Sequence, residues 1–191
     1  MEGMPDDGVD DALMVRLAAG DPEALRGIIQ RHGAPLANFL RQMTGDAAAA
    51  EDLAQESFVR VFRNAARYVP GGGFRAWLYT IGRHLAMNHA RDRQAERDVP
   101  EAQSPAAPAD RLERSELQSA IERAIAAVPE PFRGALVLCV LHGLSYEEAA
   151  DASGCSVKTL SSRLARGRER FREVIGPYLA TGTPVPVEKR C

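Results

Sequence analysis

The side chains best suited to bind nucleic acid lie near the C-terminal end of the chain, between residues 158 and 172. This segment contains six basic residues and one acidic residue, with Ser and Thr hydroxyls between them. Lys and Arg bind phosphate oxygens, and Arg and hydroxyl side chains also hydrogen-bond to base edges in the major groove. The segment therefore predicts a helix that contacts DNA. The residues predicted to make the contacts are Lys158, Thr159, Ser161, Ser162, Arg163 and Arg166.

Capping signals place this helix second in a helix-turn-helix over residues 144–172. Ser145 followed by Glu148 forms a capping box, in which each side chain satisfies the other's free backbone N–H. Gly154 can end the first helix in a left-handed conformation, and Ser156 can cap the second. The buried face of the second helix is predicted to be Val157, Leu160, Leu164 and Phe171. The alternative to a DNA-binding motif is an exposed helix whose arginines only solvate it.

A second polar face is predicted on a helix that begins at Asp46 and extends to about Tyr68. The buried stripe of this helix is predicted to be Ala54, Phe58, Val61, Phe62 and Ala65. Asp52, Gln55 and Glu56 cluster on another face, because residues three and four apart are neighbours on a helix. From these residues alone the simplest interpretation is a solvated face, whose acids also suit the positive end of the helix dipole.

The segment after the glycines at 71–73 combines aromatic and cationic side chains on one predicted helix, residues 74–93. Its core stripe is predicted to be Phe74, Trp77, Leu78, Ile81 and Leu85. Its polar surface is predicted to contain Arg75, Tyr79, Arg83, His84, Asn88, His89, Arg91 and Arg93. Aromatic and arginine side chains beside a glycine loop can hold unstacked single-stranded bases. The alternative is that Trp77 and the preceding Tyr68 are core aromatics.

Other chemistry is disfavoured by the residue pattern. Cys139, Cys155 and Cys191 are an odd number without CxxC spacing, so neither a disulfide framework nor a zinc module is indicated. Cys139 and His142 could share a helix face, but two ligands make a poor metal site. The chain shows no acid–base pair and no nucleophile constellation, and the glycines at 71–73 lack the phosphate-loop pattern. We therefore predict no enzyme activity, no small-molecule substrate, no cofactor and no metal.

Composition indicates an ordinary globular protein that needs a partner to reach DNA. The chain has 191 residues, 45% of them hydrophobic, and a net charge of −2. Residues 1–11 contain five acids and no base, which is the opposite of the cationic segment 158–172. The N-terminus lacks the features of a signal peptide, and no apolar run approaches the length of a membrane span. These features predict a cytoplasmic protein without direct membrane insertion.

Apolar residues repeat at three and four, which predicts an all-α fold of two small helical domains. We expect the first domain at 10–97 and the second, a four-helix domain, at 111–180. Residues 98–110 contain three prolines, three acids and no base, which is typical of a flexible linker. Residues 181–191 are expected to form a disordered tail. The helices expected besides those above are at about 10–19, from Asp21-Pro22 onward, at about 34–44, around 117–128 and at 131–143.

Three segments, in this order, resemble the extracytoplasmic-function (ECF) sigma factors of bacterial RNA polymerase. The family's second conserved region resembles residues 52–62, DLAQESFVRVF. Its promoter-melting and minus-ten regions resemble residues 74–92, FRAWLYTIGRHLAMNHARD. Its minus-thirty-five domain resembles residues 128–171, VPEPFRGALVLCVLHGLSYEEAADASGCSVKTLSSRLARGRERF. The resemblance implies that 10–97 is sigma region 2 and that 111–180 is sigma region 4.

The resemblance also assigns roles to the residues named above. It implies that Asp52, Gln55 and Glu56 dock on the clamp helices of core RNA polymerase, which replaces the solvated-face interpretation. It assigns Tyr68 and His84 to a pocket for a flipped base of the minus-ten element, and Arg75, Trp77 and Arg83 to strand separation. The residues assigned to minus-ten DNA are Tyr68, Arg75, Trp77, Arg83, His84 and Asn88, and those matched to the minus-thirty-five element are Ser161, Ser162, Arg163 and Arg166.

The resemblance implies recruitment rather than catalysis. The expected partners are core RNA polymerase, at its clamp helices and flap, promoter DNA, and a cognate anti-sigma factor that can be membrane-anchored. The anti-sigma factor would hold the protein inactive until a stress or other signal releases it. Two other classes compete with this interpretation. A self-sufficient helix-turn-helix regulator would bind DNA without polymerase, and a small α-helical enzyme would show turnover.

Overall fold

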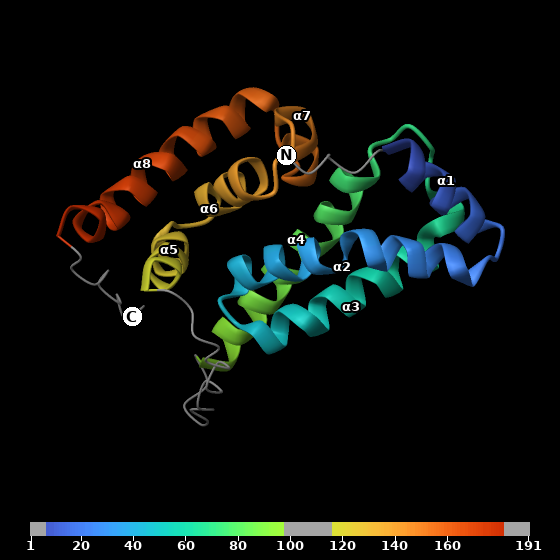
Figure 1. Ribbon diagram of the computed structural model, residues 1–191, viewed down its shortest axis with the longest axis horizontal. Coiled ribbons are helices and arrows are strands. Elements are labelled where there is room, and N and C mark those ends of the chain that lie inside the picture. Colours follow the sequence, from blue (N-terminus) through green and yellow to red (C-terminus); the bar gives the residue numbers. More distant parts are fainter. Residues whose placement is uncertain (1–6, 98–115, 182–191) are drawn as a thin grey trace. The chain divides into compact units, whose positions relative to one another are not determined.

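The computed structural model describes residues 7–97 and 116–181, and every regular element in these ranges is helical (Figure 1). The all-α prediction is therefore confirmed. Contacts divide the chain into two units, residues 1–94 and 95–191, which are described separately below. The predicted linker at 98–110, residues 1–6 of the acidic start, Cys191 and the tail beyond Thr181 lie outside the described residues.

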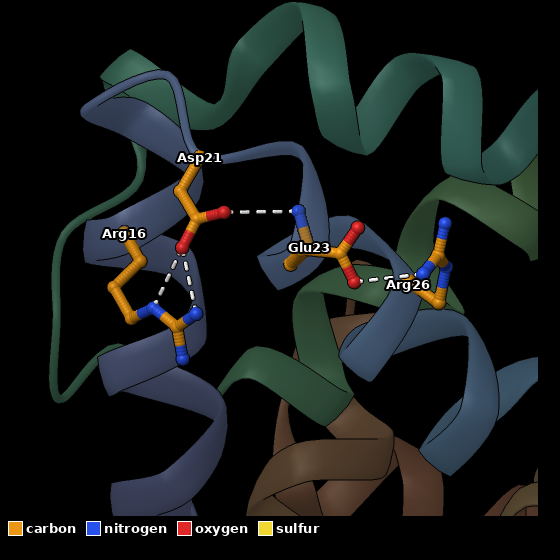
Figure 2. Close-up of polar contacts among 4 residues, drawn as sticks. All are labelled: Arg16, Asp21, Glu23 and Arg26. Carbon is orange, nitrogen blue, oxygen red and sulfur yellow. Dashed lines mark hydrogen bonds and ion pairs between the residues drawn. The ribbon is translucent and has the colours of Figure 1, made fainter.

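The first unit begins with two helices joined by a short turn, α1 (Asp7–Ala18) and α2 (Pro22–Thr44). Asp21 caps α2 by accepting a hydrogen bond of 2.9 Å from the Glu23 backbone N–H. Its second carboxylate oxygen accepts two bonds from Arg16 of α1, at 2.9 and 2.6 Å (Figure 2). The hydrogen bonds from Arg16 hold the pKa of Asp21 below its ordinary value. The Asp21 carboxylate therefore caps the N-terminus of α2 and stabilises the turn that connects α1 to α2.

α2 is one continuous helix, so the prediction of a separate helix beginning near 34 is wrong. Pro35 lies inside this helix, and a proline in a helix interior costs about 3 kcal/mol. Pro35 is exposed, whereas the apolar stripe of the helix continues past it without a change of period. Its buried members include Ile28, Leu36, Leu40 and Met43. Each buried side chain contributes about 1.5 to 3 kcal/mol, which together outweighs the cost of the proline.

α3 (Ala47–Asn64) packs beside α2 and ends in a 3-10 turn, Ala65–Arg67 (Figure 1). Asp46 caps α3 with a bond of 3.2 Å from the Ala49 N–H. The second oxygen of Asp46 pairs with Arg93 at 3.2 Å. The predicted start of this helix is therefore confirmed.

α4 (Phe74–Arg97) packs on α2 through aromatic contacts. The Tyr79 ring lies edge-on to Phe39, with 5.0 Å between the ring centroids. The prediction that Tyr79 belongs to the polar surface is wrong, because its side chain is buried in this contact. A helix with one buried stripe would leave Tyr79 in solvent, whereas α4 is buried over a wider face.

A buried charge cluster joins α1 to α2. The Asp10 carboxylate is fully buried and accepts a hydrogen bond of 2.7 Å from Arg31 Nε. Its other oxygen lies 2.9 Å from His32 Nε2, and the His32 ring packs against Phe74. Burial by itself raises the pKa of Asp10, but the hydrogen bonds and charges of His32 and Arg31 outweigh burial and hold the pKa below its ordinary value.

The Asp10 cluster predicts an acid-sensitive first domain. A carboxyl whose pKa is lower in the folded than in the unfolded chain adds stability above its ordinary pKa of 3.8. This contribution falls progressively as the pH drops below that value. Asp10→Ala is expected to lower the free energy of unfolding by about 2 to 3 kcal/mol at neutral pH and to flatten its dependence on pH between about 5 and 2. Urea unfolding at several pH values in this range measures the free energy of unfolding and its dependence on pH. An equal pH dependence for the variant and the wild type would contradict the assignment.

The second unit contains α5 (Glu116–Ala127), α6 (Phe132–Leu136), α7 (Tyr146–Ala152) and α8 (Val157–Thr181). α6 continues as a π-helical turn, Val137–Leu141, in the region predicted to be one helix at 131–143. α8 contacts α5, α6 and α7 and so forms the spine of the unit. Its C-terminal half packs on α5 through a cluster of Ala120, Ala124, Ile175 and the surrounding Ile121, Phe171, Val174 and Tyr178. The helix therefore extends beyond residue 172, where the sequence motif ends.

Gly167 allows α8 to approach the backbone of α6. A Cβ atom at this position would lie 2.8 Å from the Phe132 carbonyl oxygen, which cannot rotate away. Gly167→Ala is therefore expected to lower the free energy of unfolding by about 1 to 3 kcal/mol. Gly176 lies in the same helix with nothing near its Cβ position. Gly176→Ala is the matched control and is expected to raise stability by up to about 1 kcal/mol. Equal effects of the two substitutions in chemical unfolding would refute this packing argument.

Candidate nucleic-acid interface and docking surfaces

The helix-turn-helix is built by the predicted caps. The Ser145 hydroxyl accepts from the Glu148 N–H at 3.1 Å, and the Glu148 carboxylate accepts from the Ser145 N–H at 2.7 Å. Gly154 adopts φ of 59° after the first helix, and the Ser156 hydroxyl accepts from the Thr159 N–H at 3.2 Å. The capping box, the left-handed glycine and the second cap are therefore confirmed.

The first turns of α8 expose a cationic and hydroxyl-bearing surface. Leu160 and Leu164 are buried beneath it, whereas Val157, predicted to join them, is exposed at the helix start. Arg163 is half-buried, and the other residues predicted to contact minus-thirty-five DNA are exposed: Lys158, Thr159, Ser161, Ser162 and Arg166. The structure therefore brings the predicted residues together on one helix.

Several of these side chains are already held in place within the second unit. The Thr159 hydroxyl lies 2.9 Å from that of Ser156, and the Ser162 hydroxyl donates to the Lys158 carbonyl at 3.1 Å. The Arg166 guanidinium lies over the Phe132 ring, 5.7 Å from its centroid. The Phe132 ring therefore contacts one face of the guanidinium, while the Arg166 side chain remains exposed to solvent.

The acidic face of α3 borders an apolar groove between α2 and α3. Asp52 and Gln55 are exposed, and Glu56 is half-buried and pairs with Arg60 at 2.9 Å. The groove has a volume of about 360 Å³, and its lining residues are Leu25, Ile29, Gly33, Ala54, Gln55, Phe58, Val59 and Phe62. We call this surface the α2–α3 groove. Gln55 belongs both to the groove and to the predicted docking face.

Phe62 is 56% exposed at this groove, so the prediction that it belongs to the buried stripe is wrong. Val61, one position earlier, is fully buried, and Phe62 is rotated by about 100° from it. Ile29 and Val59 are exposed beside it. Contiguous exposed apolar side chains with a polar rim mark a protein-docking surface.

A second cavity, of about 510 Å³, lies where α3, the following 3-10 turn and α4 meet. Its lining residues are Arg60, Asn64, Arg67, Tyr68, Val69, Gly72, Trp77 and Ile81. The Tyr68 ring lies 5.4 Å from Trp77 and 6.0 Å from Phe74, centroid to centroid. We call this cavity the Tyr68 pocket. Its walls combine aromatic rings with guanidinium and amide groups, which suit stacking and polar contact with a base.

The structure does not bring all the predicted minus-ten residues to this pocket. Arg75 and Arg83 are only 6% and 7% exposed, so they do not form the cationic surface predicted from the sequence. His84 and Asn88 are exposed on α4, but they are not among the residues that line the pocket. Three polar residues of the pocket were not predicted from the sequence: Arg60, Asn64 and Arg67. The sequence does show polar side chains at these positions near the end of α3.

The second unit carries another apolar groove, which was not predicted from the sequence either. Its volume is about 300 Å³, and its lining residues are Ile121, Ile125, Leu136, Val140, Leu141, Arg168, Phe171 and Arg172. Val140 and Leu141 are 49% and 42% exposed, respectively. The sequence feature that could have predicted this groove is ALVLCVL. A helix of this sequence is apolar on all sides and so has more apolar surface than one core can bury. We call this surface the α5–α8 groove.

The described ranges contain no cluster of three or more potential metal ligands. Cys139 is half-buried, and burial raises the pKa of its thiol. Within the same ranges, no helix is both long enough and apolar enough to cross a membrane.

Comparisons with known proteins cover both units. Residues 28–96 match the family described as Sigma-70 region 2, and residues 118–171 match Sigma-70, region 4. The ECF RNA polymerase sigma factor SigE of Mycolicibacterium smegmatis is 33% identical over 84% of this chain, which spans 66% of that relative. The ECF RNA polymerase sigma factor EcfG of Rhodopseudomonas palustris is 32% identical, over 80% of this chain and 86% of the relative.

A solved structure extends the similarity to the three-dimensional fold. It is that of the sigma factor RpoE in complex with the anti-sigma factor NepR from Bartonella quintana. The two chains are 27% identical, with a TM-score of 0.66. The match covers 78% of this chain and 94% of the other.

Proposed function

This chain belongs to the ECF sigma factors of RNA polymerase, a non-enzymatic family, and we propose which of its surfaces bind core polymerase and which bind promoter DNA. The protein directs core polymerase to particular promoters in the cytoplasm and helps to open them. The single observation that carries this proposal is that each unit presents both an apolar groove and a polar surface suited to DNA. One pair of surfaces binds polymerase and the other binds promoter DNA.

Polymerase docks on the α2–α3 groove and its acidic rim. Ile29, Val59 and Phe62 offer apolar area, and Asp52 and Glu56 offer negative charge beside it. An apolar centre with a charged rim gives an interface both affinity and orientation. The occupant is the clamp helices of core polymerase, and the α5–α8 groove of the second unit receives the flap.

Promoter DNA contacts the Tyr68 pocket and the first turns of α8. Tyr68 and Trp77 supply aromatic faces for an unpaired base of the minus-ten element, and Arg67 lies beside them for phosphate contact. His84 and Asn88, exposed farther along α4, contact the same strand outside the pocket. Arg75 and Arg83 support this region from within, since both are buried. On α8, the exposed cations and hydroxyls contact the minus-thirty-five element in the major groove.

A cognate anti-sigma factor regulates the protein by covering these surfaces. Support comes from the similar sigma factor RpoE, whose solved structure contains the anti-sigma factor NepR. Exposed apolar grooves in both units give such an inhibitor places to bind. Occupying them would exclude polymerase until a signal releases the inhibitor.

An electrophoretic mobility shift assay with and without core polymerase tests the proposal. The DNA is a promoter selected from a library randomised at both elements, by the wild-type protein with core polymerase. Specific binding is expected only when core polymerase is present. Equally tight and specific binding by the purified chain alone would instead establish a self-sufficient helix-turn-helix regulator.

A further inference from the structure

Asp11 of α1 contacts two groups in the segment that forms one wall of the Tyr68 pocket. The Tyr68 hydroxyl donates to its Oδ1 atom at 2.5 Å, and the Gly71 backbone N–H donates to its Oδ2 atom at 2.7 Å. These partners lie 57 and 60 residues away in the sequence. A single carboxylate therefore connects the first helix to the loop between α3 and α4.

The carboxylate is held firmly because α1 is fixed on both sides of it. The neighbouring Asp10 is buried against Arg31 and His32 of α2, at 2.7 and 2.9 Å. At the other end of α1, Arg16 binds the cap of α2 (Figure 2). Asp11 is half-buried between these anchors. The packing of α1 on α2 and on the 3-10 turn Ala65–Arg67 therefore holds Asp11 beside the loop that it contacts.

Asp11 in turn fixes the aromatic part of the pocket. Tyr68 is held at its hydroxyl by Asp11 and at its ring by Trp77 and Phe74. Gly71 adopts φ of 82°, and its N–H is oriented by the same carboxylate. Val69 and Gly72 of this loop also line the pocket. A site whose side chains are held before the ligand arrives loses less conformational freedom on binding.

We propose that Asp11 is a positioning residue for single-stranded minus-ten DNA, through its bonds to Tyr68 and Gly71. The inference rests on the proposed role of the Tyr68 pocket in binding an unpaired base. Asp11 need not touch DNA itself. Simple electrostatics gives the opposite expectation, because removing an acid near a nucleic acid should strengthen binding.

The test compares promoter opening with promoter binding for full-length variants in the holoenzyme. The probe is the library-selected promoter; permanganate reactivity of unpaired thymines reports opening, and filter binding at low temperature reports the closed complex. Asp11→Ala is expected to reduce opening about tenfold, because this substitution removes two hydrogen bonds to a charged acceptor. Closed-complex affinity should stay within about twofold of wild type, since that complex does not yet hold an unpaired base.

Four further variants separate a positioning role from general damage to the fold. Tyr68→Phe removes one bond and keeps the ring, so it should reduce opening less than Asp11→Ala does. The double variant should open about as poorly as Asp11→Ala alone, because the bond that Tyr68→Phe removes is already absent. Asp11→Asn retains the shape and one acceptor and should fall between wild type and Asp11→Ala. Glu23→Ala on α2 is the control for removal of an exposed acid and should not reduce opening.

Trp77 gives an independent readout, because it is the single tryptophan of the chain. In Asp11→Ala without DNA, acrylamide should quench its fluorescence more strongly than in wild type. Equal opening by Asp11→Ala and wild type would overturn the inference while leaving the pocket's function intact. Parallel loss of binding and opening would show a merely structural role and would also overturn it. Failure of the wild-type holoenzyme to open the promoter would instead reject the proposed function.

Discussion

Replacing both Asp52 and Glu56 with Arg is expected to reduce promoter-specific transcription on the order of 100-fold or more. Both side chains share a face of α3 with Gln55, which lines the α2–α3 groove where the clamp helices are proposed to dock. An acidic rim is complementary to a cationic partner surface, so the reversal is expected to place like charges across the interface, which costs several kcal/mol, or at least a hundredfold in affinity. Run-off transcription and a direct assay of core-polymerase binding should show the same decrease.

Glu23→Arg is the matched control for this reversal. Like Glu56, Glu23 is a surface acid paired with an arginine on its own helix, Arg26, at 2.8 Å (Figure 2). It lies in the first turn of α2, on a different helix from the acidic face of α3 that is proposed to dock. Transcription by this variant should remain within about twofold of wild type, because isolated surface ion pairs contribute little. Full activity of the Asp52→Arg, Glu56→Arg variant would show that polymerase docks elsewhere.

Replacing Lys158 and Arg166 with Ala is expected to weaken binding of the holoenzyme to its promoter on the order of 10- to 100-fold. Both cations are exposed on the DNA-facing part of α8. Removing one cation that binds a phosphate lowers the slope of log affinity against log salt by about 0.9, so the slope should fall by nearly 2. The substitution at Arg166 also removes the guanidinium that lies over the Phe132 ring. Filter binding over a range of salt concentrations measures the affinity and the slope together.

Arg170→Ala provides the comparison on the same helix. Arg170 is exposed and pairs with Glu173 at 2.7 Å, beyond the first turns of α8. The substitution removes one positive charge without removing a residue assigned to DNA, so the salt slope should change little. An equal decrease of slope per charge for Arg170 would mean that the whole helix acts as a diffuse cationic surface. The assignment of particular residues to the minus-thirty-five element would then be wrong.

Local signals predicted the fold wherever the determining contacts lie within a few residues of one another. Ser145, Glu148, Gly154 and Ser156 specify the helix-turn-helix through caps that span three residues or fewer, and the structure contains each of these caps. Pro35 is the counterexample. The intrinsic preference of proline favours a break in the helix at this position. The helix continues because its apolar side chains on both sides of Pro35 are buried against α3 and α4, and this tertiary packing is not visible in the local sequence.

The candidate surfaces were less predictable because burial depends on tertiary packing. Arg75 and Arg83 occupy the polar positions of a helical wheel, yet α4 buries both of them. Phe62 is aromatic and adjacent to the buried Val61, yet it lies in solvent at the α2–α3 groove. The bond from Tyr68 to Asp11 joins residues 57 positions apart and has no signature in the sequence. The residue types indicated the chemistry of these sites, whereas the packing decided which side chains take part.

The most direct test of sigma-factor activity is run-off transcription with purified components on the library-selected promoter. Core polymerase with the wild-type chain should initiate at one defined position, and neither component alone should do so. The Asp52→Arg, Glu56→Arg variant should give almost no transcript, whereas Glu23→Arg should give the wild-type product. An unchanged pattern of transcripts with and without the chain would contradict the proposed sigma-factor activity. Repression by the chain, through tight DNA binding in the absence of polymerase, would contradict it equally.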